Sequence, residues 1–266
     1  MSEAEISITR GENTEVGEAG RGGGSTHGDG RIVLVAGASR GIGAAIATAF
    51  AADGARRVVL AGRTRADLER VAAAIGAAAQ VAVVDLTDAG QARALAADAG
   101  PVDVLVINAG TNRPEAFLDV EEETFDRLFA LNVRAGFFLA QAVARTMPAG
   151  GVVVFVSSQM GHVGAEHRTV YCATKHAVEG LVKAMALELA PHGVRVVSVA
   201  PTFVYTAMTA SQLDDPETGA RLRAQIPLGR PATPEEVADA VTWLASPRAA
   251  MTTGSSLLVD GGWTAR

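Results

Sequence analysis

Tyr171 and Lys175 stand four residues apart in the stretch TVYCATKHA, which leads into an apolar run of helical character. Side chains at this spacing lie on one face of a helix, where such a pair is often only a surface contact. The spacing also has a chemical use, because a nearby ammonium favours the phenolate and lowers the pKa of a phenol toward neutrality. A phenol tuned in this way can exchange a proton with a carbonyl or alcohol oxygen.

Further polar groups could serve the same chemistry. Ser157 and Ser158 follow the β-branched run GVVVFV, and a hydroxyl at Ser158 would hold a developing oxyanion and orient a carbonyl. Asn132 lies in the helical segment FALNVRAGFFLAQ, where an amide lowers helix propensity and needs partners. It could hold a water that links Lys175 to solvent, or it could be a satisfied polar group of the core. Reduction of a ketone also needs a hydride, which a nicotinamide supplies.

The stretch AGASRGIGAAIATAF predicts a nucleotide-binding loop, because it follows the first β-branched run and opens a helix. Its three glycines let the backbone turn tightly and approach a pyrophosphate, whose charge is met by the N–H groups at the helix start. Glycine triplets also occur in ordinary turns, and the flanking strand and helix favour the dinucleotide site. We expect these loop residues to contact the cofactor: Gly37, Ser39, Arg40, Gly41, Ile42 and Gly43.

The end of the second run, RRVVLAGRT, indicates which dinucleotide is bound. A carboxylate near its end would accept hydrogen bonds from the adenosine ribose of NAD, whereas arginine suits the 2′-phosphate of NADP. The sequence has Gly62 followed by Arg63, and Arg40 stands in the loop. Charge-assisted hydrogen bonds of about 1.5–3 kcal/mol would give NADP a preference of about ten- to a hundredfold. We therefore predict NADP(H) over NAD(H); the alternative is that Arg63 points into solvent.

Two further strand ends carry polar groups. Asp85 ends the third run, where its carboxylate could bond the adenine amino group or cap the next helix. Asn108, Ala109 and Gly110 end the fourth run, and their small size would let a cofactor lie close or simply form a turn.

The elements that must position these residues begin at Arg31, where short β-branched runs alternate with longer alanine-rich helical segments. The runs are RIVLVAG, ARRVVLAG, AQVAVVD, VDVLVIN, GVVVFVSS, GVRVVSVA and SSLLVDG. Each is apolar almost throughout, as expected of strands covered by helices on both faces. The pattern predicts an α/β fold, a doubly wound seven-stranded parallel sheet in a single domain spanning residues 31–266. Ligands of such sheets bind at the edge where the strand carboxyl ends collect.

Residues 1–30 differ from this body. They are rich in Gly, Glu, Ser and Thr, and their six acids and two arginines supply four of the six net negative charges. A segment of this composition cannot bury enough apolar surface to offset its ordering entropy, so we predict a disordered extension. It lacks the cationic start and apolar core of a secretory signal.

Composition excludes several classes of protein. The near-neutral body has no cationic cluster, which argues against nucleic acid as a partner, and no apolar run is long enough to cross a membrane. The five histidines have no acids or cysteines at ligand spacing, so no metal site is expected. A single cysteine, Cys172, excludes an internal disulfide and indicates a reducing cytoplasm; we expect it to pack on its helix rather than act in redox chemistry.

These motifs together resemble those of the short-chain dehydrogenase/reductase (SDR) family, in the branch that includes 3-oxoacyl-carrier-protein reductases and sugar, polyol and steroid dehydrogenases. The similarity covers about Arg31 to Arg266 and rests on AGASRGIG for the family's TGxxxGIG, NAG, LN, SSQMG, YCATK for YxxxK, and LVDGG. The resemblance implies one catalytic set, in which the serine thirteen residues before the tyrosine is chosen over Ser157: Asn132, Ser158, Tyr171 and Lys175.

The resemblance also implies a sheet ordered 3-2-1-4-5-6-7 and a homotetramer or homodimer built on the long helices after Asn108 and Tyr171. It assigns Arg63 to NADP and Asp85 to adenine, and implies further cofactor contacts at Leu86, Asn108, Ala109, Gly110, Tyr171, Lys175, Pro201, Val204 and Thr206. Two positions depart from the family pattern: Ala36 replaces a threonine of the phosphate motif, and Thr202 replaces the glycine of PGxVxT.

The predicted function is therefore an NADP(H)-dependent oxidoreductase that interconverts a ketone and a secondary alcohol, with Tyr171 as general acid/base. Ser158, Gln159 and Tyr171 are the predicted substrate contacts, and residues 204–229 form a candidate lid. The segment QMGHVGAEHR is polar, which favours a small sugar, polyol or keto acid, although solvent exposure alone would produce the same polarity. A 3-oxoacyl or biosynthetic-pathway ketoreductase is an alternative. A non-catalytic NADP-binding sensor or assembly protein is an alternative of another class, against which the intact catalytic set argues.

Overall fold

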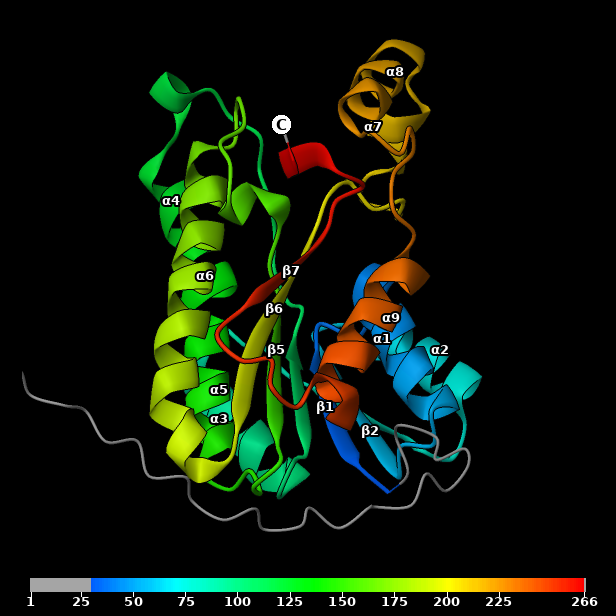
Figure 1. The fold of residues 1–266 in the computed structure, drawn as a ribbon, viewed down its shortest axis with the longest axis vertical. Coiled ribbons are helices and arrows are strands. Elements are labelled where there is room, and N and C mark those ends of the chain that lie inside the picture. The colour runs from blue at the N-terminus through cyan, green and yellow to red at the C-terminus, as the bar shows by residue number, and fades with distance from the viewer. Residues whose placement is uncertain (1–29, 266) are drawn as a thin grey trace, which may run out of the picture.

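A seven-stranded parallel sheet lies between two layers of helices in the computed structural model, which describes residues 30–265 (Figure 1). The strand order is β3-β2-β1-β4-β5-β6-β7, which confirms the predicted doubly wound topology. The predicted N-terminal extension lies outside the described residues except for Gly30. The strands are β1 (Ile32–Ala36), β2 (Arg57–Gly62), β3 (Ala79–Val83), β4 (Val104–Ile107), β5 (Val152–Val156), β6 (Arg195–Pro201) and β7 (Ser256–Val259).

Burial follows position in the sheet. The central strands β1, β4 and β5 are buried along their whole length, as their β-branched sequences require. The edge strands β3 and β7 are partly exposed, with Val83 46% and Leu258 41% accessible. The edge strands are thus less completely covered than the central ones, although helices lie on both faces of the sheet, as expected.

Each face of the sheet has its own hydrophobic core. On one face α3 (Ala89–Ala99), α5 (Gly136–Ala144) and α6 (Thr169–Leu189) pack on the strands, and on the other α1 (Gly41–Ala52) and α9 (Pro234–Ala245) do so, with α2 (Arg65–Ile75) beside them (Figure 1). The alternating strand residues divide between the two cores: Leu34 belongs to one, and Val33 and Val35 to the other. Both helical layers therefore hold the sheet rigidly below its carboxyl edge.

The segments around the carboxyl edge are less regular. Helix α4 (Glu122–Phe129) continues through a π-helical turn, η2 (Ala130–Ala135), into α5. The short helices α7 (Ala210–Asp214) and α8 (Pro216–Gln225) stand beyond the end of the sheet, at the top of Figure 1. These two helices make up most of the candidate lid, and the Tyr205 hydroxyl, which donates to the Asp214 carboxylate, fixes its start.

Two features are absent from the described part of the chain. No helix within residues 30–265 has both the length and the apolar character that crossing a membrane takes. Nor do three or more His, Cys, Asp or Glu side chains of these residues gather as metal ligands would.

Candidate functional site

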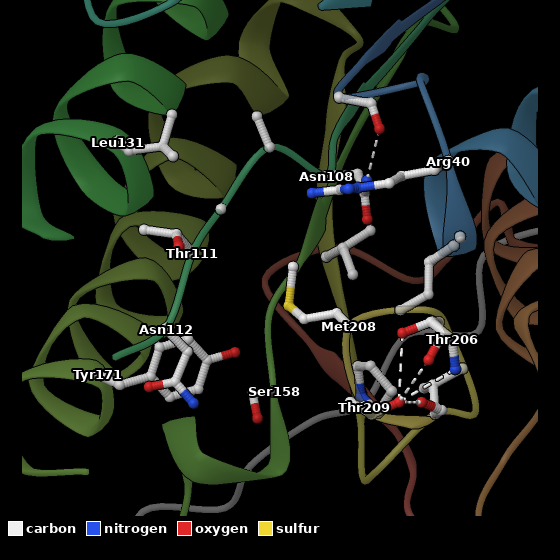
Figure 2. A pocket seen from close by; sticks show the side chains of 18 of the residues that line it. Arg40, Asn108, Thr111, Asn112, Leu131, Ser158, Tyr171, Thr206, Met208 and Thr209 are labelled. Atoms are coloured by element: carbon white, nitrogen blue, oxygen red, sulfur yellow. Dashed lines mark hydrogen bonds between the residues drawn. The ribbon is translucent and has the colours of Figure 1, made fainter. Parts of the chain in front are cut away.

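A cavity of about 540 Å³ opens at the carboxyl edge of the sheet (Figure 2). Its wall comes from the β1–α1 loop, the ends of β2 to β6, the start of α6 and the segment before α7. It brings together nearly all the predicted site residues: Gly37, Ser39, Arg40, Gly41, Ile42, Arg63, Asp85, Leu86, Asn108, Ala109, Gly110, Ser158, Gln159, Tyr171, Lys175, Pro201, Val204 and Thr206. Gly43 and Asn132 do not line the cavity.

The glycine-rich loop is shaped by close backbone contacts. Gly37 and Gly41 have φ of 87° and 55°, a region that residues with a side chain rarely adopt. A Cβ on Gly43 would lie 2.0 Å from the carbonyl oxygen of Gly37, which also accepts a hydrogen bond from Asn108 Nδ2 at 2.8 Å. The Arg40 side chain makes no capping bond to α1, so the N–H groups of the first helical turn are left to bind an anion.

The charged groups at this end of the cavity come from three strand ends. Arg40 and Arg63 are exposed side chains that line the cavity. Hydrogen bonds from the hydroxyl and amide of Thr87 hold the pKa of Asp85 below its ordinary value, and the charge of Arg63 adds to the effect. The alternative that Asp85 caps the next helix is wrong, since Asp88 is the N-cap of α3. The contact of Asp85 with adenine stays a prediction.

Ser158 and Tyr171 lie at the other end, away from Asn108 and Arg40 in the view of Figure 2, and Lys175 lines the same cavity. Ser158 follows β5 and shares a hydrogen bond with the Tyr171 phenol. The Lys175 ammonium lies 5.6 Å from the centre of the Tyr171 ring and donates to the carbonyl oxygen of Val156 at 2.9 Å. The helical spacing thus places the phenol and the ammonium on the face of α6 that looks into the cavity.

Burial dominates the acidities of this pair. It raises the pKa of Tyr171 to about 12, and the hydrogen bond from Ser158 and the charge of Arg168 offset this only in part. The expectation that Lys175 would lower the pKa of the phenol toward neutrality is therefore wrong in direction. Burial also lowers the pKa of Lys175 to about 8, against the raising effect of the Glu179 carboxylate. At neutral pH the phenol carries its proton, which is the state that a general acid needs.

Glu179 connects the ammonium to the neighbouring strands. It lies one helical turn after Lys175 and is buried, and its carboxylate accepts hydrogen bonds from Ser198 on β6 at 2.9 Å and Ser256 on β7 at 3.2 Å. The Nε2 of His162 is 3.4 Å from the same carboxylate. The sequence analysis did not single out Glu179, although a carboxylate four residues after a lysine on a helix is a recognisable pair.

Asn132 is tied into the protein framework. Its Nδ2 donates to the carbonyl oxygen of Thr111 at 2.8 Å and to the hydroxyl of Thr174 at 3.1 Å, while its Oδ1 accepts from the amide of Thr111 at 2.8 Å. The side chain therefore holds the loop after β4 against α6. This is the core polar group that the sequence left open as an alternative; a catalytic role for Asn132 stays a prediction. Its place in the π-helical turn was not foreseen.

The cavity wall also includes Thr111, Asn112 and Thr202, which were not predicted as contacts. Arg168 and Met208 line it as well, and they come from the two segments, residues 159–168 and 204–229, that the sequence linked to the substrate. For Thr202, the departure from the family pattern was the available signal.

A parallel sheet of this order, with a glycine-rich loop opening α1 at its carboxyl edge, defines a Rossmann-type nucleotide-binding fold. A family profile described as enoyl-(acyl carrier protein) reductase matches residues 37–264. The chain is 44% identical to the L-xylulose reductase of Homo sapiens, over 89% of this chain and 97% of that protein. It is 38% identical to the D-threitol dehydrogenase of Mycolicibacterium smegmatis, over 89% and 94% respectively.

A solved structure is similar as well. It is that of a putative NAD(P)-dependent gluconate 5-dehydrogenase from Beutenbergia cavernae with bound NADP at low occupancy, and it matches with a TM-score of 0.86 and 38% identity over 91% of this chain and 100% of that one. The chain belongs to the short-chain dehydrogenase/reductase family, which confirms the family resemblance of its motifs.

The charge of Glu179 should be measurable at Lys175. Because the carboxylate raises the pKa of Lys175, Glu179→Gln should move the titration of this lysine to lower pH than the value of about 8. The chain has only two lysines, Lys175 and Lys183, so NMR of protein labelled with ¹³C at lysine Cε can follow each one. The exposed Lys183 is an internal reference.

The matched control is Glu188→Gln, which removes an exposed carboxylate from the same helix and should leave the Lys175 titration in place. If Glu179→Gln and the parent protein titrate at the same pH, the carboxylate does not support the ammonium.

Proposed function

We propose that the chain is an NADP(H)-dependent oxidoreductase that interconverts a ketone and a secondary alcohol of a sugar, polyol or sugar acid. The observation that carries the proposal is the meeting of Ser158, Tyr171 and Lys175 at one end of a cavity whose other end is the glycine-rich loop. Relatives named L-xylulose reductase and D-threitol dehydrogenase support neutral sugars and polyols. The structure named as a putative gluconate 5-dehydrogenase supports a sugar acid.

The residues present fit NADP. The backbone contact that leaves no room for a Cβ at Gly43 forms a tight cradle, and the uncapped start of α1 suits a pyrophosphate. Arg40 and Arg63 line the adjoining wall, where two cations suit a 2′-phosphate. The solved structure of the putative gluconate 5-dehydrogenase contains NADP at low occupancy, which supports the same choice here. We assign Gly37, Arg40, Gly41, Arg63 and Asp85 to cofactor binding on these grounds.

In ketone reduction, bound NADPH would supply the hydride that reaches the carbonyl carbon. Tyr171 donates its phenolic proton to the carbonyl oxygen, and the hydroxyl of Ser158 holds that oxygen in place as charge develops. Lys175 stabilises the phenolate that remains, until a proton from solvent restores the phenol. At neutral pH the Tyr171 phenol is protonated, as proton donation to a ketone requires, whereas alcohol oxidation needs the phenolate as base.

We also propose that the chain forms a homotetramer or homodimer. An apolar groove runs over α4, η2, α5 and α6 and is lined by Phe129, Val133, Phe137, Phe138 and Leu181. These are the elements after β4 and at Tyr171 on which the family resemblance places subunit contacts. The apolar lining supports an interface between copies of this chain, since exposed patches of this kind commonly mark contact surfaces.

Replacement of the phenol tests the function most directly. Tyr171→Phe removes the proton donor and should lower kcat for ketone reduction by about a hundredfold or more, with NADPH binding retained. The other tyrosine of the chain provides the control, because Tyr205 bonds to Asp214 outside the cavity wall and Tyr205→Phe should keep most of its turnover. Kinetics follow the absorbance of NADPH over a panel of ketones. Turnover of Tyr171→Phe close to that of the parent would rule out the proposed acid.

Coenzyme choice is tested separately. Arg63→Ala should reduce the ratio of kcat/KM with NADPH to kcat/KM with NADH by about ten- to a hundredfold, the worth of charge-assisted hydrogen bonds to a phosphate. Arg65→Ala is the control, because Arg65 pairs with Glu69 on the surface and does not line the cavity. An unchanged ratio in Arg63→Ala would discard the assignment of this arginine.

Assembly is tested by sedimentation equilibrium of the full chain. We expect a dimer or tetramer, and Phe137→Glu, which puts a charge into the apolar groove, should shift the protein toward smaller species. A parent protein that is monomeric at micromolar concentration would contradict the proposed interface.

A further inference from the structure

Arg168 is a cation at the substrate end of the cavity, three residues before Tyr171. It lines the wall together with Ser158, Gln159 and Tyr171, and it is half-buried. Its guanidinium donates to the carbonyl oxygen of its neighbour His167 at 3.2 Å. None of the ion pairs found within residues 30–265 includes Arg168.

The other charges on the cavity wall are already accounted for. Arg40 and Arg63 stand at the nucleotide end, and Asp85, the one carboxylate among the lining residues that the structure describes, stands there too. Lys175 donates to a backbone carbonyl and faces the Glu179 carboxylate from within the protein. At the substrate end of the cavity, Arg168 is therefore a cation to which no carboxylate partner has been assigned.

Holding this cation without a carboxylate is unfavourable. Burial lowers the pKa of Arg168, and the groups whose charges oppose this are Tyr171 and Cys172, neither of which is a carboxylate. An arginine keeps its charge in proteins, and within residues 30–265 no carboxylate counts among the charges that act on this half-buried guanidinium. Helix α6, which starts at Thr169, adds no acid in its first turn, and its dipole also favours an anion nearby.

Polar side chains share the cavity wall with Arg168. Thr111, Asn112 and Ser158 line the cavity together with it, and side chains of these types exchange hydrogen bonds with hydroxyls. The guanidinium fork matches the two oxygens of a carboxylate. The wall therefore combines polar groups that suit hydroxyls with a donor for an acid group.

We propose that Arg168 binds a carboxylate of the substrate, so that the enzyme prefers polyhydroxylated keto acids to the corresponding neutral ketoses. This inference rests on the proposed function, since the acid group must belong to the molecule whose ketone Tyr171 protonates. The carboxylate then lies at Arg168 while the ketone lies at Tyr171, two residues that line the same cavity.

A second effect of Arg168 must be separated from this one. Its charge favours the phenolate of Tyr171, so replacing it alters the proton donor for every substrate. The quantity to compare is therefore the ratio of kcat/KM for the acid to kcat/KM for the neutral ketone. An effect through Tyr171 changes both values by the same factor and leaves this ratio unchanged, so a change in the ratio reports carboxylate binding.

The experiment compares 5-keto-D-gluconate with L-sorbose, two ketones that differ only by a carboxylate in place of a CH₂OH group. Rates with NADPH give kcat/KM for each ketone on the parent enzyme and on Arg168→Gln, Arg168→Lys and Arg70→Gln. The last is the control, since Arg70 pairs with Asp67 on α2 and does not line the cavity. NADPH binding and circular dichroism verify that each variant is folded.

We expect the parent to prefer 5-keto-D-gluconate. Arg168→Gln should lower the acid-to-neutral ratio of kcat/KM by about ten- to a hundredfold, the range for a lost charge-assisted hydrogen bond, and Arg168→Lys by less. Arg70→Gln should leave the ratio unchanged. A parent that prefers L-sorbose, or an Arg168→Gln variant whose ratio equals that of the parent, overturns the proposal.

Two further outcomes distinguish a failure of the carboxylate-binding proposal from a failure of the proposed function. If the parent reduces neither ketone but reduces another, the proposed function stands, and D-gluconate and D-glucitol are compared as inhibitors of that reaction. Stronger inhibition by D-gluconate that is lost in Arg168→Gln supports carboxylate binding, and equal inhibition overturns it. If the parent reduces no ketone with NADPH or NADH, the proposed function fails and the inference fails with it.

Discussion

Burial of the Lys175 ammonium is the constraint on which the site depends. A charged amine inside a protein is costly unless polar groups compensate for its lost water. Here the ammonium donates to the carbonyl oxygen of Val156, and the charge of the Glu179 carboxylate raises the pKa of Lys175 against the effect of burial. The carboxylate is buried in turn and takes hydroxyls from Ser198 and Ser256. One charge network therefore joins α6 to β5, β6 and β7, and a shift of any of these elements would change the charge beside the phenol.

Desolvation acts on the two partners in opposite directions. It disfavours the charged form of each, so the pKa of Tyr171 rises to about 12 while that of Lys175 falls to about 8. The effects that lower the pKa of the phenol are the hydrogen bond with Ser158 and the charge of Arg168, and burial outweighs both. Both groups consequently hold their protons near neutral pH, which suits proton donation to a ketone better than proton removal from an alcohol.

Much of the fold could be predicted from the sequence because its signals are local. A β-branched run such as Val152–Val156 is apolar at every position, which only a strand covered on both faces explains, and the helical segments between the runs enforce parallel pairing. The glycine positions of the β1–α1 loop likewise report on backbone contacts at short sequence separation. The partial exposure of β3 and β7 was not foreseen, since an apolar run does not reveal whether a strand has a neighbour on each side.

The site was predictable only where spacing along one element determines geometry. Tyr171 and Lys175 share a helix face because they are four residues apart, so their proximity follows from the helix itself. The partners of Asn132, Thr111 and Thr174, are 21 and 42 residues away, and no periodicity could foretell that they satisfy its amide.

The sign of the pKa shift at Tyr171 was missed for a related reason, since the sequence shows which charges are close along the helix but not how much water they lose. The same limit applies to Arg168. In the sequence it stands two residues after Glu166, which suggests a solvated pair, yet no carboxylate counts among the charges that act on its guanidinium. Whether a charge has a partner is a property of the folded chain, and the absence of a carboxylate beside Arg168 is what distinguishes a residue of the cavity wall from a polar residue of a loop.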